Sequence, residues 1–93
     1  MPTGTAVVDF GPWPGASDAQ IAVTGQAAIL ATSLCESEIR AQTATAAHSV
    51  DEHVIEALRV TTRDVVAGIG FTIHVVCDNS LAYGTWNLYW VWV

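Results

Sequence analysis

The last ten residues, GTWNLYWVWV, alternate large apolar side chains with other side chains. Successive residues of a strand face opposite sides of a sheet, so this pattern predicts a strand with one fully apolar face. That face carries Trp86, Leu88, Trp90 and Trp92, and the other carries Thr85, Asn87, Tyr89, Val91 and Val93. The second face begins polar and becomes apolar, which is expected where both faces of a strand are covered. We therefore expect the first face to lie in the core and the end of the second to contact a loop, another subunit or a larger assembly.

Other short stretches of the chain are β-branched or alternate with the same period of two. They are Thr5–Phe10, the segment around Ile21 and Val23, residues 34–41, residues 54–61 and Phe71–Cys77. In residues 34–41 one predicted face is mostly charged and the other mostly apolar; the first carries Leu34, Glu36, Glu38 and Arg40, and the second carries Cys35, Ser37, Ile39 and Ala41. The whole pattern predicts one domain over residues 1–93, an all-β fold built as a small antiparallel β-sandwich or barrel of about six to seven strands.

Breaks between these strands are marked by turn-forming residues. Gly11–Gly15 contains two prolines and two glycines and predicts a rigid turn, in which Trp13 either covers the core or forms an exposed contact. Residues 63–68 are expected to connect two strands, and residues 78–80 to form a turn. Ser49 followed by Glu52 matches a capping box and predicts one short helical turn near Ser49–His53. An α+β fold with a helix from Ser49 is the main alternative.

Composition limits the classes of partner. Hydrophobic residues make up 52% of the chain and charged residues 13%, about half the usual charged share. The net charge of −6 disfavours nucleic acid, whose backbone is bound by Lys and Arg, and equally disfavours an anionic membrane surface. The first residues lack a signal-peptide pattern, so we expect a protein made in a cytoplasm. Part of the apolar surface is expected to contact protein.

Chemistry-bearing residues are few. Cys35 and Cys77 fit no C-x-x-C pattern and are expected to be small buried side chains. His48, Asp51 and His53 form the one titratable cluster with Glu52, and His74 is the remaining histidine. Their spacing does not match His-Glu-x-x-His, so we favour a solvated acidic turn over a metal site. No nucleophile elbow occurs, and we expect no enzyme activity, no cofactor and no metal.

The chain resembles small virion structural proteins of tailed bacteriophages. The residues that carry the resemblance are VDFGPWPGASDAQIAVTGQAAI, HSVDEHVIE, AGIGFTIHV and the closing YWVWV. The resemblance implies a β-sandwich subunit of the virion, assembled in the bacterial host cytoplasm. It further implies a capsid decoration (cement) protein that binds and stabilises the capsid lattice as an oligomer, with a trimer expected and the major capsid protein or other virion subunits as partners. A tail or head–tail connector component is the alternative.

Aromatic residues concentrate binding energy at interfaces, so the expected protein contacts are Trp13, Tyr89, Trp90, Trp92 and Val93. Two other classes of function remain as alternatives. A metal-dependent enzyme would need His48, Asp51 and His53 to converge. A soluble binding module for a protein or sugar would instead use Trp13 and Tyr83 around an exposed cleft.

Overall fold

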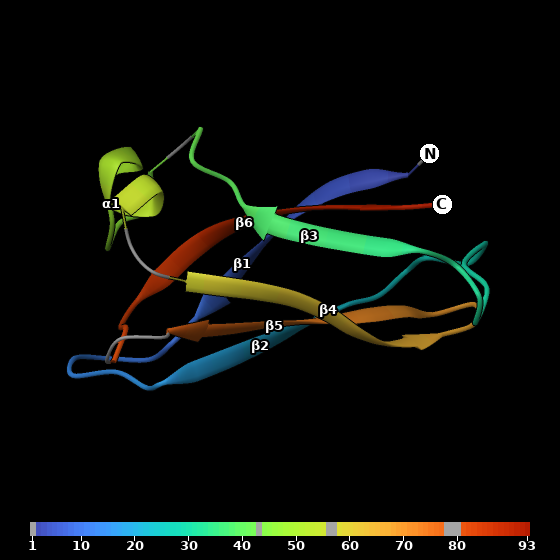
Figure 1. Ribbon diagram of the computed structural model, residues 1–93, viewed down its shortest axis with the longest axis horizontal. Coiled ribbons are helices and arrows are strands. Elements are labelled where there is room, and N and C mark those ends of the chain that lie inside the picture. The colour runs from blue at the N-terminus through green and yellow to red at the C-terminus, as the bar shows by residue number, and fades with distance from the viewer. Residues whose placement is uncertain (1, 43, 56–57, 78–80) are drawn as a thin grey trace.

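The structure is a computed structural model, and it describes residues 2–42, 44–55, 58–77 and 81–93. In these residues the chain forms six strands and one short helix, arranged as two antiparallel three-stranded sheets (Figure 1). The first sheet has the order β1-β6-β3, with β1 at Thr3–Asp9, β6 at Thr85–Trp92 and β3 at Cys35–Ile39. The second has the order β2-β5-β4, with β2 at Asp18–Val23, β5 at Gly70–Cys77 and β4 at Leu58–Val66. The predicted small all-β fold is confirmed.

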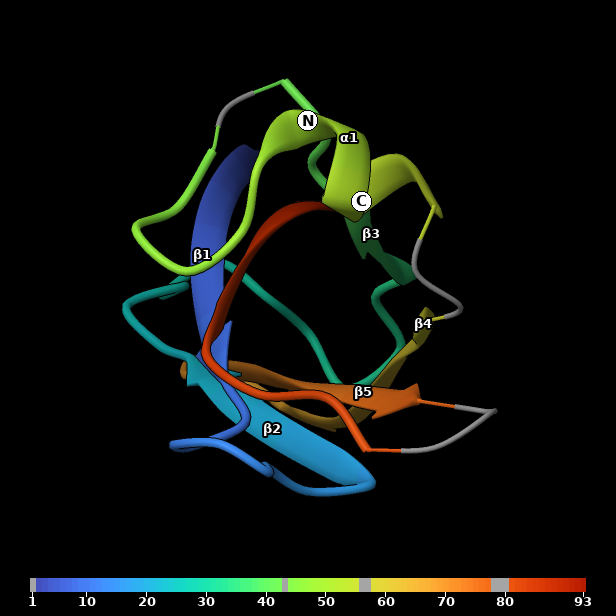
Figure 2. The ribbon, with the colours of Figure 1, turned by 90° about the vertical axis from the view of Figure 1, so that its left-hand side faces the viewer.

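The two sheets face each other and enclose the core between them, as Figure 2 shows. They also approach each other along two edges, because β3 lies against β4 and β1 lies against β2. At the first of these edges the hydroxyl oxygens of Ser37 and Thr62 are hydrogen bonded at 2.8 Å. The molecule measures 37 × 23 × 18 Å, and its described part contains no helix long and apolar enough to span a membrane.

The strand β6 is the centre of the first sheet, and its register explains how three tryptophans fit on one face. Trp90 lies between Gly4 of β1 and Ser37 of β3, both of which are small. A Cβ atom added to Gly4 would lie 2.4 Å from the Trp90 ring. Small residues on the neighbouring strands therefore make room for the ring. The prediction that one face of the closing strand is core is confirmed, because its four large residues are all buried: Trp86, Leu88, Trp90 and Trp92.

The second sheet follows the predicted alternation in β5, where Phe71, Ile73, Val75 and Cys77 are buried. Its neighbour β4 differs from the predicted strand at both ends. The predicted connector at residues 63–68 is largely strand, since β4 continues to Val66 through a change of register between Arg63 and Val66. Asp64 has a φ of 56° within this irregularity, a conformation that Asp tolerates better than most residues.

The helix α1, Val50–Ile55, also shortens a predicted strand. The stretch from residue 54 was expected to be extended, but residues 54 and 55 end the helix and β4 begins at Leu58. Residues 56–57, and the turn expected at 78–80, lie outside the described residues. The predicted capping box is confirmed: the Glu52 backbone N–H donates to Ser49 Oγ at 3.2 Å, and the Ser49 N–H donates to Glu52 Oε1 at 3.1 Å. Both bonds satisfy N–H groups that a helix start leaves without partners.

The rigid turn predicted at Gly11–Gly15 is present and is hydrogen bonded at both ends. The Gly15 N–H donates to the Pro12 carbonyl at 2.7 Å, and the Gly84 N–H donates to the Gly11 carbonyl at 2.8 Å. Immediately after it, Ala16 and Ala82 exchange two backbone hydrogen bonds at 2.9 and 3.0 Å. These bonds fix the turn against the segment that leads into β6.

Two glycines of this turn differ in surroundings and allow a matched test. Both have positive φ, 91° at Gly11 and 87° at Gly15, but a Cβ would meet nothing within 4 Å at Gly11 and would lie 1.7 Å from the Ala82 carbonyl oxygen at Gly15. Gly11→Ala should therefore cost about 1 kcal/mol of unfolding free energy, the cost of the backbone conformation alone. Gly15→Ala should cost about 3 kcal/mol or more, because the bridge to Ala82 must open. Urea unfolding of both variants measures the difference, and equal losses would contradict this account of the turn.

Candidate functional site

The histidine cluster is buried, which corrects the interpretation of this segment as a solvated turn. His48 and His53 are each only 4% exposed. Together with α1 they cover the end of the core where β6 begins, and both contact the Trp86 ring. The His48 ring stacks on it with centroids 3.6 Å apart and planes 16° apart, and the His53 ring meets it edge-on at 5.0 Å. The cap of acidic residues was predicted correctly, but the histidines lie beneath it.

All four ring nitrogens of these histidines have hydrogen-bond partners. His48 Nδ1 lies 2.7 Å from Glu52 Oε2, and His48 Nε2 lies 2.5 Å from the Tyr83 carbonyl oxygen. His53 Nδ1 lies 2.7 Å from the Ser49 carbonyl oxygen, and its Nε2 accepts from the Asn87 backbone N–H at 3.0 Å. Each of these nitrogens is therefore already engaged within the protein. The third histidine, His74, lies on the other sheet and pairs with Asp18 at 2.7 Å.

Within the described ranges, no group of three or more His, Cys, Asp or Glu side chains is placed to hold a metal ion. Asp51 belongs to the same helical turn, but no interaction joins it to either histidine ring. The convergence that the metal-dependent alternative requires is therefore not formed by His48, Asp51 and His53.

One partner of His48 fixes the role of one of its ring nitrogens. Carbonyl oxygens accept hydrogen bonds and cannot donate them, so Nε2 donates to Tyr83. Nδ1 faces the Glu52 carboxylate at 2.7 Å, and the His48 ring lies flat on the Trp86 ring. His48 thus links α1, the Tyr83 backbone and the core tryptophan.

The contact with His48 changes the pKa of Glu52. Its hydrogen bond with His48, and next the bond from the Ser49 backbone N–H, lower the pKa of the carboxyl below its ordinary value of 4.5. A carboxyl whose pKa is lower in the folded protein than in the unfolded chain stabilises the fold above the unfolded value. This contribution is lost as the pH falls through the lower, folded-state pKa.

Trp86 is fully buried, and its Nε1 has no hydrogen-bond partner among the described residues. An indole N–H left without a partner costs about 1 to 3 kcal/mol. Ring contacts with the two histidines and burial in the core outweigh that cost. Trp86 is consequently held by packing rather than by hydrogen bonding.

A ladder of aromatic rings connects this buried tryptophan to the surface. Tyr83 lies 4.9 Å from His48, and Trp13 meets Tyr83 edge-on at 5.3 Å with planes 83° apart. Trp13 is 77% exposed. We call Trp13, Tyr83, His48 and Trp86 the aromatic ladder. Of the two possibilities left open for Trp13, the structure supports an exposed residue rather than a cover over the core.

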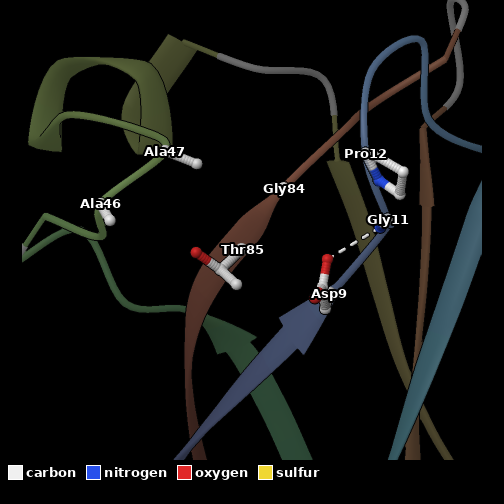
Figure 3. Close-up of a pocket in the computed structure, with 7 residues that line it drawn as sticks. All are labelled: Asp9, Gly11, Pro12, Ala46, Ala47, Gly84 and Thr85. Atoms are coloured by element: carbon white, nitrogen blue, oxygen red, sulfur yellow. Dashed lines mark hydrogen bonds between the residues drawn. The ribbon is translucent and has the colours of Figure 1, made fainter.

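A shallow hollow lies beside the ladder, and Figure 3 shows it. Its volume is about 380 Å³, and it is lined by Asp9, Gly11, Pro12, Ala46, Ala47, Gly84 and Thr85. In the close-up, the Asp9 carboxylate and the Thr85 hydroxyl lie on the strand side, and Ala46 and Ala47 lie on the opposite side. Most lining residues are small, so backbone of a bound molecule could approach closely here.

The opposite end of the molecule carries an apolar patch. Leu34 and Val93 are 74% and 66% exposed and exchange two backbone hydrogen bonds. Beside them, the outer face of β6 presents Tyr89 and Val91 next to Glu36 of β3, and a hollow of about 330 Å³ lies among these side chains. We call Leu34, Glu36, Tyr89, Val91 and Val93 the C-terminal patch. It corresponds to the face of the closing strand that was predicted to need cover.

The predicted contact residues separate into two groups. Trp13, Tyr89 and Val93 are exposed, whereas Trp90 and Trp92 are 8% and 7% exposed. The last two fill the protein's own core, and Trp92 Nε1 donates to Gln26 Oε1 at 2.9 Å, so we correct their assignment from contact to core residues. Leu34 was not among the predicted contacts. The sequence feature that could have identified Leu34 as a contact is its apolar side chain on a strand face that is otherwise charged.

The cysteines are placed in different sheets. Cys77 is buried in the core as expected, whereas Cys35 is only partly buried and packs against the core. Neither forms a disulfide. Burial raises the pKa of the Cys35 thiol, which disfavours the reactive thiolate.

The pairing of His48 with Glu52 predicts a specific dependence of stability on pH. Glu52→Gln keeps a side chain able to cap the helix but removes the charged acceptor of the His48 bond. The variant should be less stable than the unsubstituted protein at about pH 7, and the difference should shrink as the pH falls below 4.5 toward about 3. Urea unfolding across this pH range measures it.

Asp51→Asn is the matched control, because Asp51 is a neighbouring carboxylate in the same helical turn that does not touch His48. The difference in unfolding free energy between Asp51→Asn and the unsubstituted protein should not shrink over the same pH range. A Glu52→Gln difference that stays constant from neutral to acid pH would contradict the role given to this pair.

Comparison of the chain with protein-family models, with curated protein sequences and with solved structures gave no match. Two kinds of surface on this molecule could support a function. They are the exposed end of the aromatic ladder with its hollow, and the C-terminal patch.

Proposed function

We propose that this protein is a structural subunit that works by docking to other proteins, and that the C-terminal patch is its main contact surface. One observation carries the proposal: the end of the last strand is apolar on both faces, and only its inner face is buried by the protein's own fold. The outer face leaves Val93 and the adjoining Leu34 largely in water. Burying a large aliphatic side chain is worth about 1.5 to 3 kcal/mol, which favours cover by a partner.

The composition of the patch suits a protein partner. Aliphatic side chains form its centre and a tyrosine lies beside them, while Glu36 supplies a charge at its edge. Interfaces typically combine such an apolar centre with a polar rim. A partner that places aliphatic groups over Val91 and Val93 and a basic group near Glu36 would be complementary.

More aliphatic side chains are exposed at the same end of the molecule. The loop between β2 and β3, the turn between β4 and β5, and both chain termini all lie at this end (Figure 1). Leu30 is exposed in the loop, and Val66 and Ile69 are exposed at the turn. The backbones of these two segments are hydrogen bonded, with the Gly68 N–H donating to the Ile29 carbonyl at 2.9 Å. A docking partner could therefore extend its contact from the patch onto this end.

Following the resemblance described above, we propose that the assembly is the virion of a tailed bacteriophage. The subunit would act as a capsid decoration protein that binds the lattice of the major capsid protein as an oligomer, with assembly in the bacterial host cytoplasm. The compact β-sandwich and the exposed apolar end support such a role. Mass spectrometry of purified heads and purified tails tests it, since a decoration protein must be present in the heads in fixed stoichiometry.

Charges placed in the C-terminal patch should abolish docking without unfolding the protein. Leu34→Asp combined with Val93→Asp changes two exposed side chains and leaves the buried Trp90 and Trp92 intact. We expect the oligomer and the particle-bound fraction to fall more than tenfold, because each aspartate replaces about 2 kcal/mol of apolar burial by a desolvated charge. Sedimentation velocity and co-sedimentation with particles measure both.

Leu81→Asp is the matched control, since it adds a charge at another exposed leucine at the opposite end of the molecule. It should sediment and bind as the unsubstituted protein does. Normal decoration of particles by the Leu34→Asp/Val93→Asp variant would exclude the patch as the docking surface.

A further inference from the structure

The exposed end of the aromatic ladder is a second surface, distinct from the C-terminal patch. Trp13 is far more exposed than the other three tryptophans, all of which are buried. Its ring is held in place, because the Trp13 and Tyr83 rings meet edge to face and the Tyr83 ring contacts His48. A large aromatic ring that is held in place while most of its surface stays in water resembles the anchor of a binding site.

The turn that carries Trp13 is fixed before any partner arrives. The Gly11 N–H donates to Asp9 Oδ1 at 2.8 Å, and the Phe10 N–H donates to the Gly84 carbonyl at 3.0 Å. Together with the bonds that close Gly11–Gly15, these contacts tie the turn to both β1 and the start of β6. Binding to the ring would thus cost little conformational entropy.

The adjoining hollow has a negative charge and no positive one. Of its lining residues, Asp9 is the one with a charged side chain. Asp9 Oδ1 accepts from Gly11, whereas Oδ2 has no hydrogen-bond partner within the described part of the chain. Figure 3 shows the carboxylate at the margin of the hollow, close to the Pro12 ring where the turn with Trp13 begins. An aromatic face and a carboxylate on one short segment are both attractive to a cation.

We propose that Trp13, Tyr83 and Asp9 bind an arginine side chain presented by an extended segment of a partner protein. The guanidinium plane stacks on the exposed face of Trp13 and its N–H groups donate to Asp9 Oδ2, while the backbone of the segment crosses the small residues that line the hollow. Arginine fits better than lysine, because its planar group combines stacking with directed hydrogen bonds.

The partner is a different protein rather than a second copy of this chain. The sequence contains no lysine and three arginines. Arg63 pairs with Asp64 at 2.9 Å, and Arg40 and Arg59 also have partners within the chain. With a net charge of −6, two copies would also repel each other at an acidic surface.

This inference goes beyond the proposed function and does not depend on it. The turn with Trp13 and the C-terminus lie at opposite ends of the 37 Å long axis (Figure 1). Both surfaces can therefore be occupied at once, and a substitution in one leaves the other intact. Failure of decoration by patch variants and failure of arginine binding are separate results.

The test uses the full-length protein and a short peptide of alternating glycine and arginine, followed through the indole N–H signals in NMR spectra. The signal missing in Trp13→Leu identifies Trp13. We expect that signal to shift on titration in the unsubstituted protein, while the signals of Trp86, Trp90 and Trp92 stay in place. Trp13→Leu should weaken binding about two- to fivefold, the range of an exposed cation–π contact.

Asp9→Asn tests the charge of Asp9 separately from its structural role, because the amide oxygen can still accept from the Gly11 N–H while the charge is removed. It should weaken binding severalfold and reduce the dependence of affinity on salt. Glu38→Gln removes one negative charge at an exposed position of β3 that belongs to neither named surface, and it is the matched control, with no specific effect expected.

Three results would each overturn the inference. The Trp13 signal could remain unshifted at saturation with the arginine peptide. A glycine–leucine peptide could bind as tightly, which would indicate an apolar site. Glu38→Gln could weaken binding as much as Asp9→Asn, which would indicate attraction to net charge alone. The unperturbed signals of the three buried tryptophans report folding of each variant.

Discussion

The rest of this structure depends on the packing of the inner face of β6 against the opposite sheet. Trp86, Leu88, Trp90 and Trp92 lie along the central strand of one sheet and reach the opposite sheet, where Phe71 meets Trp90 edge-on at 5.5 Å. Each large aromatic removes about 150 to 250 Å² from water, worth about 4 to 6 kcal/mol. The net stability of a domain is about 5 to 15 kcal/mol, so a chain of this size cannot do without these rings. Small residues on β1 and β3, Gly4 and Ser37 among them, follow from the same need for space.

The end of this core is covered by His48 and the helix α1, which belong to neither sheet. His48 stacks on Trp86, and its two nitrogens attach it to α1 through Glu52 and to the segment before β6 through Tyr83. A polar ring in such a place is stable because every donor has an acceptor. The same ring supports Tyr83, and through it Trp13. Order at the surface thus derives from packing in the core, which is why an exposed tryptophan is held in one position.

The two ends of the molecule differ in chemistry. One end exposes aliphatic side chains around Leu34 and Val93, which suit contact with another apolar surface. The other exposes an aromatic ring beside the Asp9 carboxylate, which suits a cation. On the two proposals made above, such unlike ends would let the protein contact two different neighbours at once, while its net charge of −6 would limit unspecific adhesion.

The sequence by itself determined the strands, because a period of two along β1, β3, β5 and β6 is a local property that any sheet must respect. It also determined the capping box at Ser49 and Glu52 and the rigid turn around Trp13, which depend on neighbours only a few residues apart. It did not determine where α1 ends or that β4 continues to Val66, since the register with β5 settles that boundary. The alternation separated the core face of β6 from its outer face, but aromatic content led us to name Trp90 and Trp92 as contact residues as well, and only the packing showed that they are core. The burial of His48 and His53, and the ladder from Trp86 to Trp13, were decided by tertiary structure alone. They join residues up to 70 positions apart, between Trp13 and Tyr83, and no local pattern encodes which rings will meet.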